Sequence, residues 1–77
     1  METIYKTEVL RFFGIGAAKI TYSYTTTKEG CFFKIVLQSL VTGQEMNLAV
    51  GFQGHPVDKV TEMLEKFSQN LSITREK

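Results

Sequence analysis

The sequence has few of the residues that define disulfide-stabilised, metal-binding or strongly charged proteins. A single cysteine among 77 residues excludes an internal disulfide, and one cysteine with one histidine is too few for a structural zinc site. Nine basic and eight acidic side chains leave a net charge of +1, which argues against the strong positive field of a duplex-DNA or anionic-membrane binder. We therefore predict no metal, no cofactor and no membrane partner.

Long apolar runs are also missing, since no stretch could span a bilayer and the acidic start, Met1-Glu2, is unlike a secretory leader. The expected location is the cytoplasm, either of the producing cell or of a host cell. The length predicts a single domain, residues 1–77, with a small and marginal hydrophobic core. The polar segment 71–77 is predicted to be a loose tail.

Six glycines mark the corners of the chain and separate runs of residues that are typical of strands. Each run holds about eight to ten residues rich in Val, Ile, Thr, Phe and Tyr, which favours strands joined by tight turns. After Pro56 the apolar period changes from two to about 3.6, which predicts a helix. The pattern therefore predicts an α+β fold, a four-stranded antiparallel meander sheet with one C-terminal helix packed on one face.

The clearest prediction concerns the hairpin around Thr42-Gly43. If these two residues form the loop, the register places six large apolar side chains on one side of the sheet. The expected pairs on that side are Leu37 with Leu48, Ile35 with Val50, and Phe33 with Phe52. The expected pairs on the other side are Gln38 with Asn47, Val36 with Ala49, and Lys34 with Gly51.

The preceding hairpin turns near residues 27–30. A connection of two or four residues places one set of apolar side chains beside another, because side chains alternate between the two sides of a strand. The two sets are Ile20, Tyr22 and Tyr24, and Phe33, Ile35 and Leu37.

Two registers stay open for residues 3–13. A two-residue loop at Ile15-Gly16 sends Val9, Arg11 and Phe13 to the core side, whereas a three-residue loop from Gly14 sends Leu10 and Phe12 there instead. A β-bulge that switches sides within the strand is a third alternative, and a short helix over residues 7–13 is a fourth.

The helix is predicted to begin at Pro56, where a missing N–H has no helical partner to lose. It is expected to fray near Asn70. Glu62 and Lys66 are spaced for an i,i+4 ion pair. One side of the helix is apolar and consists of Val57, Val60, Met63, Leu64 and Phe67.

Cys31 and His55 are the one combination in the sequence that could supply a nucleophile and its base. No third group that would orient the histidine is evident. The glycine-containing segment 14–18 precedes a strand pattern, not the helix that a phosphate-binding loop requires. We therefore predict that the protein is not an enzyme.

The apolar side chains exceed what one helix can cover, so a patch is expected on the opposite side of the sheet. Small proteins usually bury such a patch against another chain. We predict a homodimer, most simply with two-fold symmetry, and keep edge-strand pairing and a different protein as alternatives. The predicted interface residues are Phe32, Lys34, Val36 and Leu40, with Phe12 and Arg11 as further members.

The predicted function is that of a non-catalytic protein-binding module that acts by occupying a protein partner. A phage- or mobile-element-encoded inhibitor and an accessory subunit of a larger assembly both fit this description. The alternative is a single-stranded nucleic-acid-binding protein, which needs stacked aromatic side chains framed by lysine and arginine. Phe32 with Lys34, Lys19 and Arg11 is a sparse set for that purpose, and the near-zero net charge argues against nucleic acid.

Overall fold

The computed structural model describes residues 2–12, 14, 16–54 and 57–74. Its elements are β1 (Glu2–Phe12), β2 (Gly16–Thr27), β3 (Gly30–Ser39), β4 (Glu45–Gln53) and α1 (Val57–Thr74). The strands form one antiparallel sheet in the order β1-β2-β3-β4, so each strand pairs with its neighbour in the sequence. The predicted α+β meander with a C-terminal helix is confirmed.

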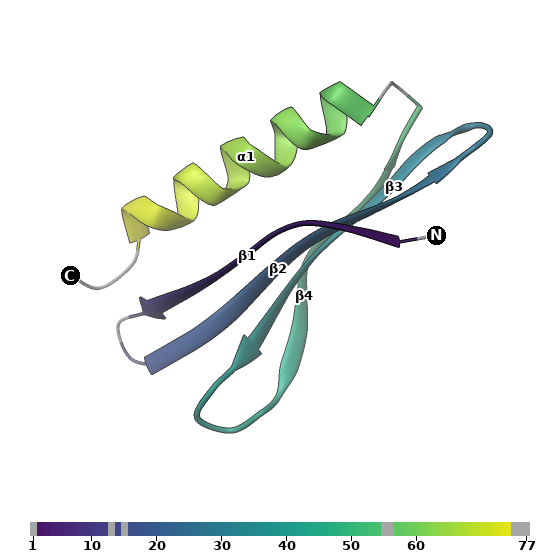
Figure 1. The fold of residues 1–77 in the computed structure, drawn as a ribbon. Coiled ribbons are helices and arrows are strands. Elements are labelled where there is room, and N and C mark those ends of the chain that lie inside the picture. Colours follow the sequence, from purple (N-terminus) through teal and green to yellow (C-terminus); the bar gives the residue numbers. More distant parts are fainter. Residues whose placement is uncertain (1, 13, 15, 55–56, 75–77) are drawn as a thin grey trace.

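Figure 1 shows two layers, with α1 lying across one side of the twisted sheet and no described element on the other side. The helix packs on β1, β2 and β3. The core lies between the layers, where alternate strand residues meet the apolar side of the helix. Its buried members are Leu10, Ile20, Tyr22, Cys31, Ile35, Val60 and Leu64.

The β2–β3 hairpin has the predicted register. Lys28 and Glu29 form a two-residue connection between Thr27 and Gly30, which pair with each other. The three expected apolar pairs form, namely Ile20 with Leu37, Tyr22 with Ile35, and Tyr24 with Phe33. This regular ladder is the centre of the sheet and contributes four of the seven buried core residues.

In β1, the three-residue loop from Gly14 predicts the correct sides for Leu10 and Phe12 but the wrong loop bounds, because Gly16 is the first residue of β2 and pairs with Phe12. A β-bulge between Ile4 and Lys6 shifts the register, as one of the open alternatives allowed. The residues from Lys6 to Phe12 alternate so that Leu10 is buried under the helix, whereas Ile4 faces away from it. The alternative of a short helix is wrong for residues 7–12, which are strand.

The turn between β3 and β4 is wider than the predicted Thr42-Gly43 loop. Ser39 donates its backbone N–H to the Gln44 carbonyl at 2.9 Å, and its hydroxyl accepts the Thr42 N–H at 3.1 Å. Gly43 adopts a φ of 80°, the left-handed conformation that glycine takes most readily. Local hydrogen bonds from a serine side chain therefore set the length of this turn.

The pairing of β3 with β4 differs from the predicted register in two ways. The wider turn moves it by two residues, so that Leu37 lies opposite Met46 rather than Leu48. A shift of two keeps each side chain on its predicted side, and Leu37 and Leu48 both pack against the core. The second difference is a β-bulge, in which Ile35 lies opposite Ala49 and Leu48 is the extra residue.

The extra residue reverses the sides of the β4 residues that follow it. Val50 lies opposite Lys34, and Phe52 lies opposite Phe32. The predicted placement of Val50 and Phe52 on the helix side is therefore wrong. Ala49 and Gly51, which were expected on the opposite side, take the helix side instead.

A close approach between Phe33 and Gly51 gives the physical reason for this reversal. A Cβ on Gly51 would lie 2.7 Å from Phe33 Cζ, so the phenylalanine ring fills the space that a side chain would need. The helix side of β4 therefore accepts the small residues Ala49 and Gly51 and has no room for Val50 or Phe52.

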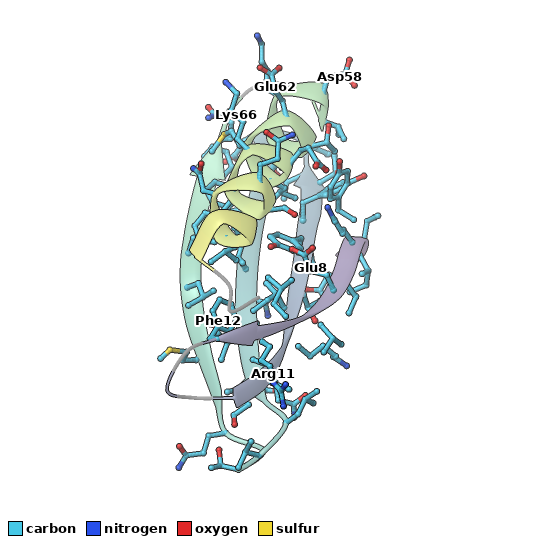
Figure 2. The ribbon with its side chains drawn as sticks, turned by 90° about the vertical axis from the view of Figure 1, so that its left-hand side faces the viewer. Glu8, Arg11, Phe12, Asp58, Glu62 and Lys66 are labelled. Carbon is cyan, nitrogen blue, oxygen red and sulfur yellow. The ribbon has the colours of Figure 1, made fainter. Side chains whose placement is uncertain are left out.

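The helix follows its predicted pattern along most of its length. Val60 and Leu64 are buried against the sheet, and Met63 lies at the exposed margin of the apolar side. Glu62 and Lys66 form the expected i,i+4 ion pair, with Nζ 3.8 Å from Oε1. Figure 2 shows both on the side of α1 away from the sheet.

The end of the helix differs from the prediction, since α1 continues to Thr74 instead of fraying near Asn70. Residues 71–74 are helical rather than part of a loose tail, and Leu71 packs against the core cluster. This apolar contact gives the last turn a tertiary partner. Pro56 and residues 75–77 lie outside the described residues. Among the described residues, no helix is long and apolar enough to cross a membrane.

Candidate interaction surface

The side of the sheet opposite α1 in Figure 1 is here called the open face. It carries several large apolar side chains that are about half exposed or more. They come from three different strands and are Ile4 (54%), Val9 (60%), Phe32 (50%), Val50 (61%) and Phe52 (45%). Between them lie Thr21 and Thr25 of β2, which are partly buried. The open face is therefore a mixed surface with apolar groups at both edges of the sheet.

The densest apolar part of the open face is the Phe32–Phe52 patch, formed by Phe32, Val50 and Phe52. The two rings lie opposite each other on β3 and β4, with centroids 4.6 Å apart and planes tilted by 59°. Val50 is two residues from Phe52 on the same side of β4. Tilted aromatic pairs of this kind attract each other beyond their shared burial.

Charged and polar groups lie directly beside this patch. Lys34 Nζ is 3.9 Å from Glu2 Oε2, and the same oxygen accepts a hydrogen bond from the buried Ser23 hydroxyl at 3.0 Å. Together with Phe32 and Val50 these residues line a shallow cavity of about 160 Å³. The surface therefore combines apolar area with one anchored ion pair.

The structure brings five of the six predicted interface residues to the open face. Phe32, Lys34 and Val36 alternate along β3 on this side. Arg11 and Leu40 lie at the far end, where Arg11 is opposite Ala17 and the Leu40 N–H donates to the Ala17 carbonyl at 3.0 Å.

Phe12 is the exception, because it packs against the core cluster on the helix side. Arg11 and Phe12 are the last two residues of β1 (Figure 2), so alternation sends them to opposite sides. The predicted place of Phe12 on the open face is therefore wrong.

Three further residues, Ile4, Val50 and Phe52, lie on the open face although the apolar pattern did not predict them there. Ile4 precedes a β-bulge, and Val50 and Phe52 follow one. A bulge reverses the side of the sheet on which the next residues lie, and the apolar pattern does not indicate where it occurs. The signal that could have found Val50 and Phe52 is the order of sizes in Ala49-Val50-Gly51-Phe52. Small residues alternate with large ones there, as expected where one side of a strand is already filled.

A second cluster of chemically active groups lies on the helix side and joins α1 to β1 and β2. The Tyr22 hydroxyl donates to Glu8 Oε1 at 2.6 Å, and Ser68 on the helix donates to the same oxygen at 2.9 Å. Lys6 Nζ lies 2.9 Å from the Ser68 hydroxyl and 3.6 Å from Glu65 Oε1. Figure 2 shows Glu8 on the strand beside the helix.

Burial, followed by the hydrogen bond to Glu8, raises the pKa of Tyr22 well above its usual value. The hydrogen bond from the Tyr5 hydroxyl to Glu65, 3.1 Å long, likewise raises the pKa of Tyr5. Both phenols are therefore proton donors held in place by carboxylates. Glu65, the partner of Tyr5, and Ser68, the second donor to Glu8, lie on α1, so the cluster fastens the two layers together.

A further cavity of about 460 Å³ lies at the β3–β4 turn. Its apolar lining comes from Leu37, Val41 and Met46, and its polar lining includes Ser39 and Glu45.

Cys31, the nucleophile of the catalytic hypothesis, is 2% exposed and belongs to the core. His55, its proposed base, lies outside the described residues. Within the ranges that the structure describes, no three His, Cys, Asp or Glu side chains are grouped closely enough to hold a metal ion.

Comparisons with protein-family models, with curated proteins and with solved structures find no match for this chain.

Proposed function

We propose that this chain is a small non-catalytic protein-binding module that acts as a homodimer and docks on another protein through its open face. The observation that carries the proposal is the exposure of the Phe32–Phe52 patch, with Ile4 and Val9, on a face that no described element covers. Contiguous apolar surface in a small protein is usually covered by a partner. Such a module works by occupying its partner, as an inhibitor or an accessory subunit does.

The placement of Cys31 supports a binding role over a catalytic one. Its side chain is only 2% exposed and packs in the core, at the inner wall of a surface cavity of about 310 Å³ beside the β2–β3 turn. The polar groups of the helix side are likewise engaged with each other in fastening α1 to the sheet. The open face, in contrast, keeps apolar groups such as Phe32 and a charged group, Lys34, exposed.

Sedimentation of the wild-type protein at micromolar concentrations tests the homodimer. A concentration-dependent monomer–dimer equilibrium is expected, because a small domain gains core stability by association. A monomer at every concentration would contradict this part of the proposal.

Substitution of Val36 tests the open face, since this residue lies at its centre between Thr21 and Asn47. Val36→Glu places a charge on the docking surface, whereas Val36→Thr keeps the β-branched shape as a matched control. With each protein as bait in an extract of the native cells, a protein retained by the wild type and by Val36→Thr should be reduced about tenfold or more by Val36→Glu. Equal retention of that protein by all three baits would show that the open face is not the docking surface.

A second candidate function, single-stranded nucleic-acid binding, gains one observation from the structure. The β4 bulge brings Phe52 beside Phe32, so the open face has two adjacent aromatic side chains instead of one, and Lys34 follows Phe32 on the same side of β3. A labelled oligonucleotide should then bind with an affinity that falls steeply with salt and with Phe52→Leu, but not with Val9→Leu. No binding at low salt would remove this candidate.

A further inference from the structure

The two edges of the sheet differ in how they are protected against pairing with another strand. No more than three consecutive residues of β1 are uncharged, since it carries Glu2, Lys6, Glu8 and Arg11, and its bulge at Tyr5 interrupts the ladder. β4 carries no charged side chain after Glu45, and beyond its own bulge residues 49–53 pair regularly with β3. Charges and bulges are the means by which edge strands avoid pairing. The edge of β4 beyond its bulge lacks both.

The backbone groups of Val50 and Phe52 point to this free edge. Along β3, Ser39 donates its N–H toward the β4 side, to Gln44, and Leu40 donates toward β2, to Ala17. Backbone groups alternate in this way along a strand, so the even-numbered β3 residues direct theirs to β2. Val50 and Phe52 lie opposite Lys34 and Phe32, which are even-numbered, and therefore turn their own N–H and C=O groups outward.

We propose that two copies of the chain pair their β4 strands in antiparallel fashion about a two-fold axis and form one eight-stranded sheet. The proposal rests on the homodimer of the proposed function and specifies how the two copies meet. Val50 of each copy lies opposite Phe52 of the other, and the two Gly51 residues face each other at the axis. The two Val50–Phe52 pairs then exchange about four backbone hydrogen bonds.

We assign a second copy of the chain to the β4 edge because a pair of β4 strands gives a closed assembly of two copies. Two β4 strands related by a two-fold axis leave β1 as the edge on both sides, and β1 is charged and bulged. Pairing of β4 with β1 of another copy would be open-ended and would lead to fibres. The charge pattern of the two edges therefore favours a closed dimer over a fibre.

This register also suits the side chains. At the axis Gly51 has no side chain, and its helix side is already filled by the Phe33 ring. Glu45 lies outside the paired segment, so the two copies bring no like charges together. On the open face, Val50 of one copy lies beside Phe52 of the other, which joins the two Phe32–Phe52 patches into one continuous apolar stripe for the partner protein.

Substitution of Val50 by proline tests the pairing. Val50→Pro removes an N–H that points to the free edge, and proline is tolerated at such edge positions, so the monomer keeps its sheet. The dimer dissociation constant should rise about tenfold or more, because a buried hydrogen-bond partner is lost in each copy. The matched control Val50→Thr keeps the N–H and the β-branched shape, and its dissociation constant should stay within about threefold of the wild-type value.

Amide hydrogen exchange on the wild-type protein provides a measurement that needs no variant. In the dimer, the amides of Val50 and Phe52 are hydrogen-bonded between copies. Their exchange should slow about tenfold or more between dilute and concentrated samples, while the amides of Glu2 and Ile4 on β1 should show no such change.

The outcomes separate this inference from the proposed function. A wild-type protein that stays monomeric contradicts the homodimer itself. A dimer that resists Val50→Pro and leaves the Val50 and Phe52 amides unprotected overturns the edge pairing and leaves the homodimer standing. A dimer that Val36→Glu abolishes while Val50→Pro spares it shows that the copies meet through their open faces, which also overturns the inference.

Discussion

The two sides of the sheet both carry large apolar residues and yet place them in different environments. On the helix side Ile20, Tyr22 and Ile35 are almost completely buried, whereas on the open face Phe32 and Val50 keep half or more of their surface exposed. The same strands and the same alternation produce both sides, so the difference comes from the presence of a second layer on one of them. Stability is therefore concentrated between sheet and helix, and the apolar groups of the open face stay exposed.

The largest effect is expected from a cavity on the helix side. Leu64 is fully buried between α1 and the sheet, so Leu64→Ala should lower the free energy of unfolding by about 2–5 kcal/mol in urea denaturation. The matched truncation on the open face, Val9→Ala, should cost less than about 1 kcal/mol because Val9 is exposed. Equal losses for the two variants would contradict the difference between the two sides.

Tyr22→Phe tests the polar fastening of the helix. It removes a hydroxyl that donates to Glu8 at 2.6 Å and should cost about 1.5–3 kcal/mol, because hydrogen bonds to charged groups are strong. Urea unfolding at neutral pH measures this loss. A variant as stable as the wild type would show that the hydroxyl contributes nothing to the stability of the fold.

The same residue predicts a dependence on alkaline pH. Burial and the hydrogen bond to Glu8 raise the pKa of Tyr22 in the folded protein, so above about pH 10 the unfolded chain ionises first and stability falls. Below that pH this contribution is fully present. Between about pH 9 and about pH 11, the free energy of unfolding should fall less steeply with pH in Tyr22→Phe than in the wild type. Part of the fall should remain in the variant because the pKa of Tyr5 is also raised. Parallel curves for variant and wild type would contradict the role of Tyr22.

The smallest effect is expected from Gly51→Ala, which tests why Val50 and Phe52 face outward. The new Cβ would lie 2.7 Å from Phe33 Cζ and should cost about 1 kcal/mol as the ring moves. Gly54→Ala is the control, since its Cβ would meet nothing closer than 3.8 Å, and its stability should stay within about 0.5 kcal/mol of the wild type. A neutral Gly51→Ala would show that the ring does not need the empty position.

Part of the open face could be predicted from the sequence and part could not. Phe32, Lys34 and Val36 lie on β3, whose register with β2 follows from strict alternation on both strands. Val50 and Phe52 lie beyond a bulge, where the alternation changes sides. The location of the bulge depends on the contact of the Phe33 ring with Gly51. A contact between two strands does not change the apolar period of either strand, so the sequence pattern does not predict it.

The amino-acid pattern alone determined the order of the elements, the β2–β3 register and the apolar side of the helix, because each depends on neighbours two to four residues apart. Tertiary structure decided the sides of Phe12, Val50 and Phe52 and carried the helix on to Thr74. Those outcomes depend on a connection length, an inserted residue and the contact of Leu71 with the core, which arise when distant segments meet. Periodicity describes one element at a time, whereas packing chooses among the ways in which the elements can be combined.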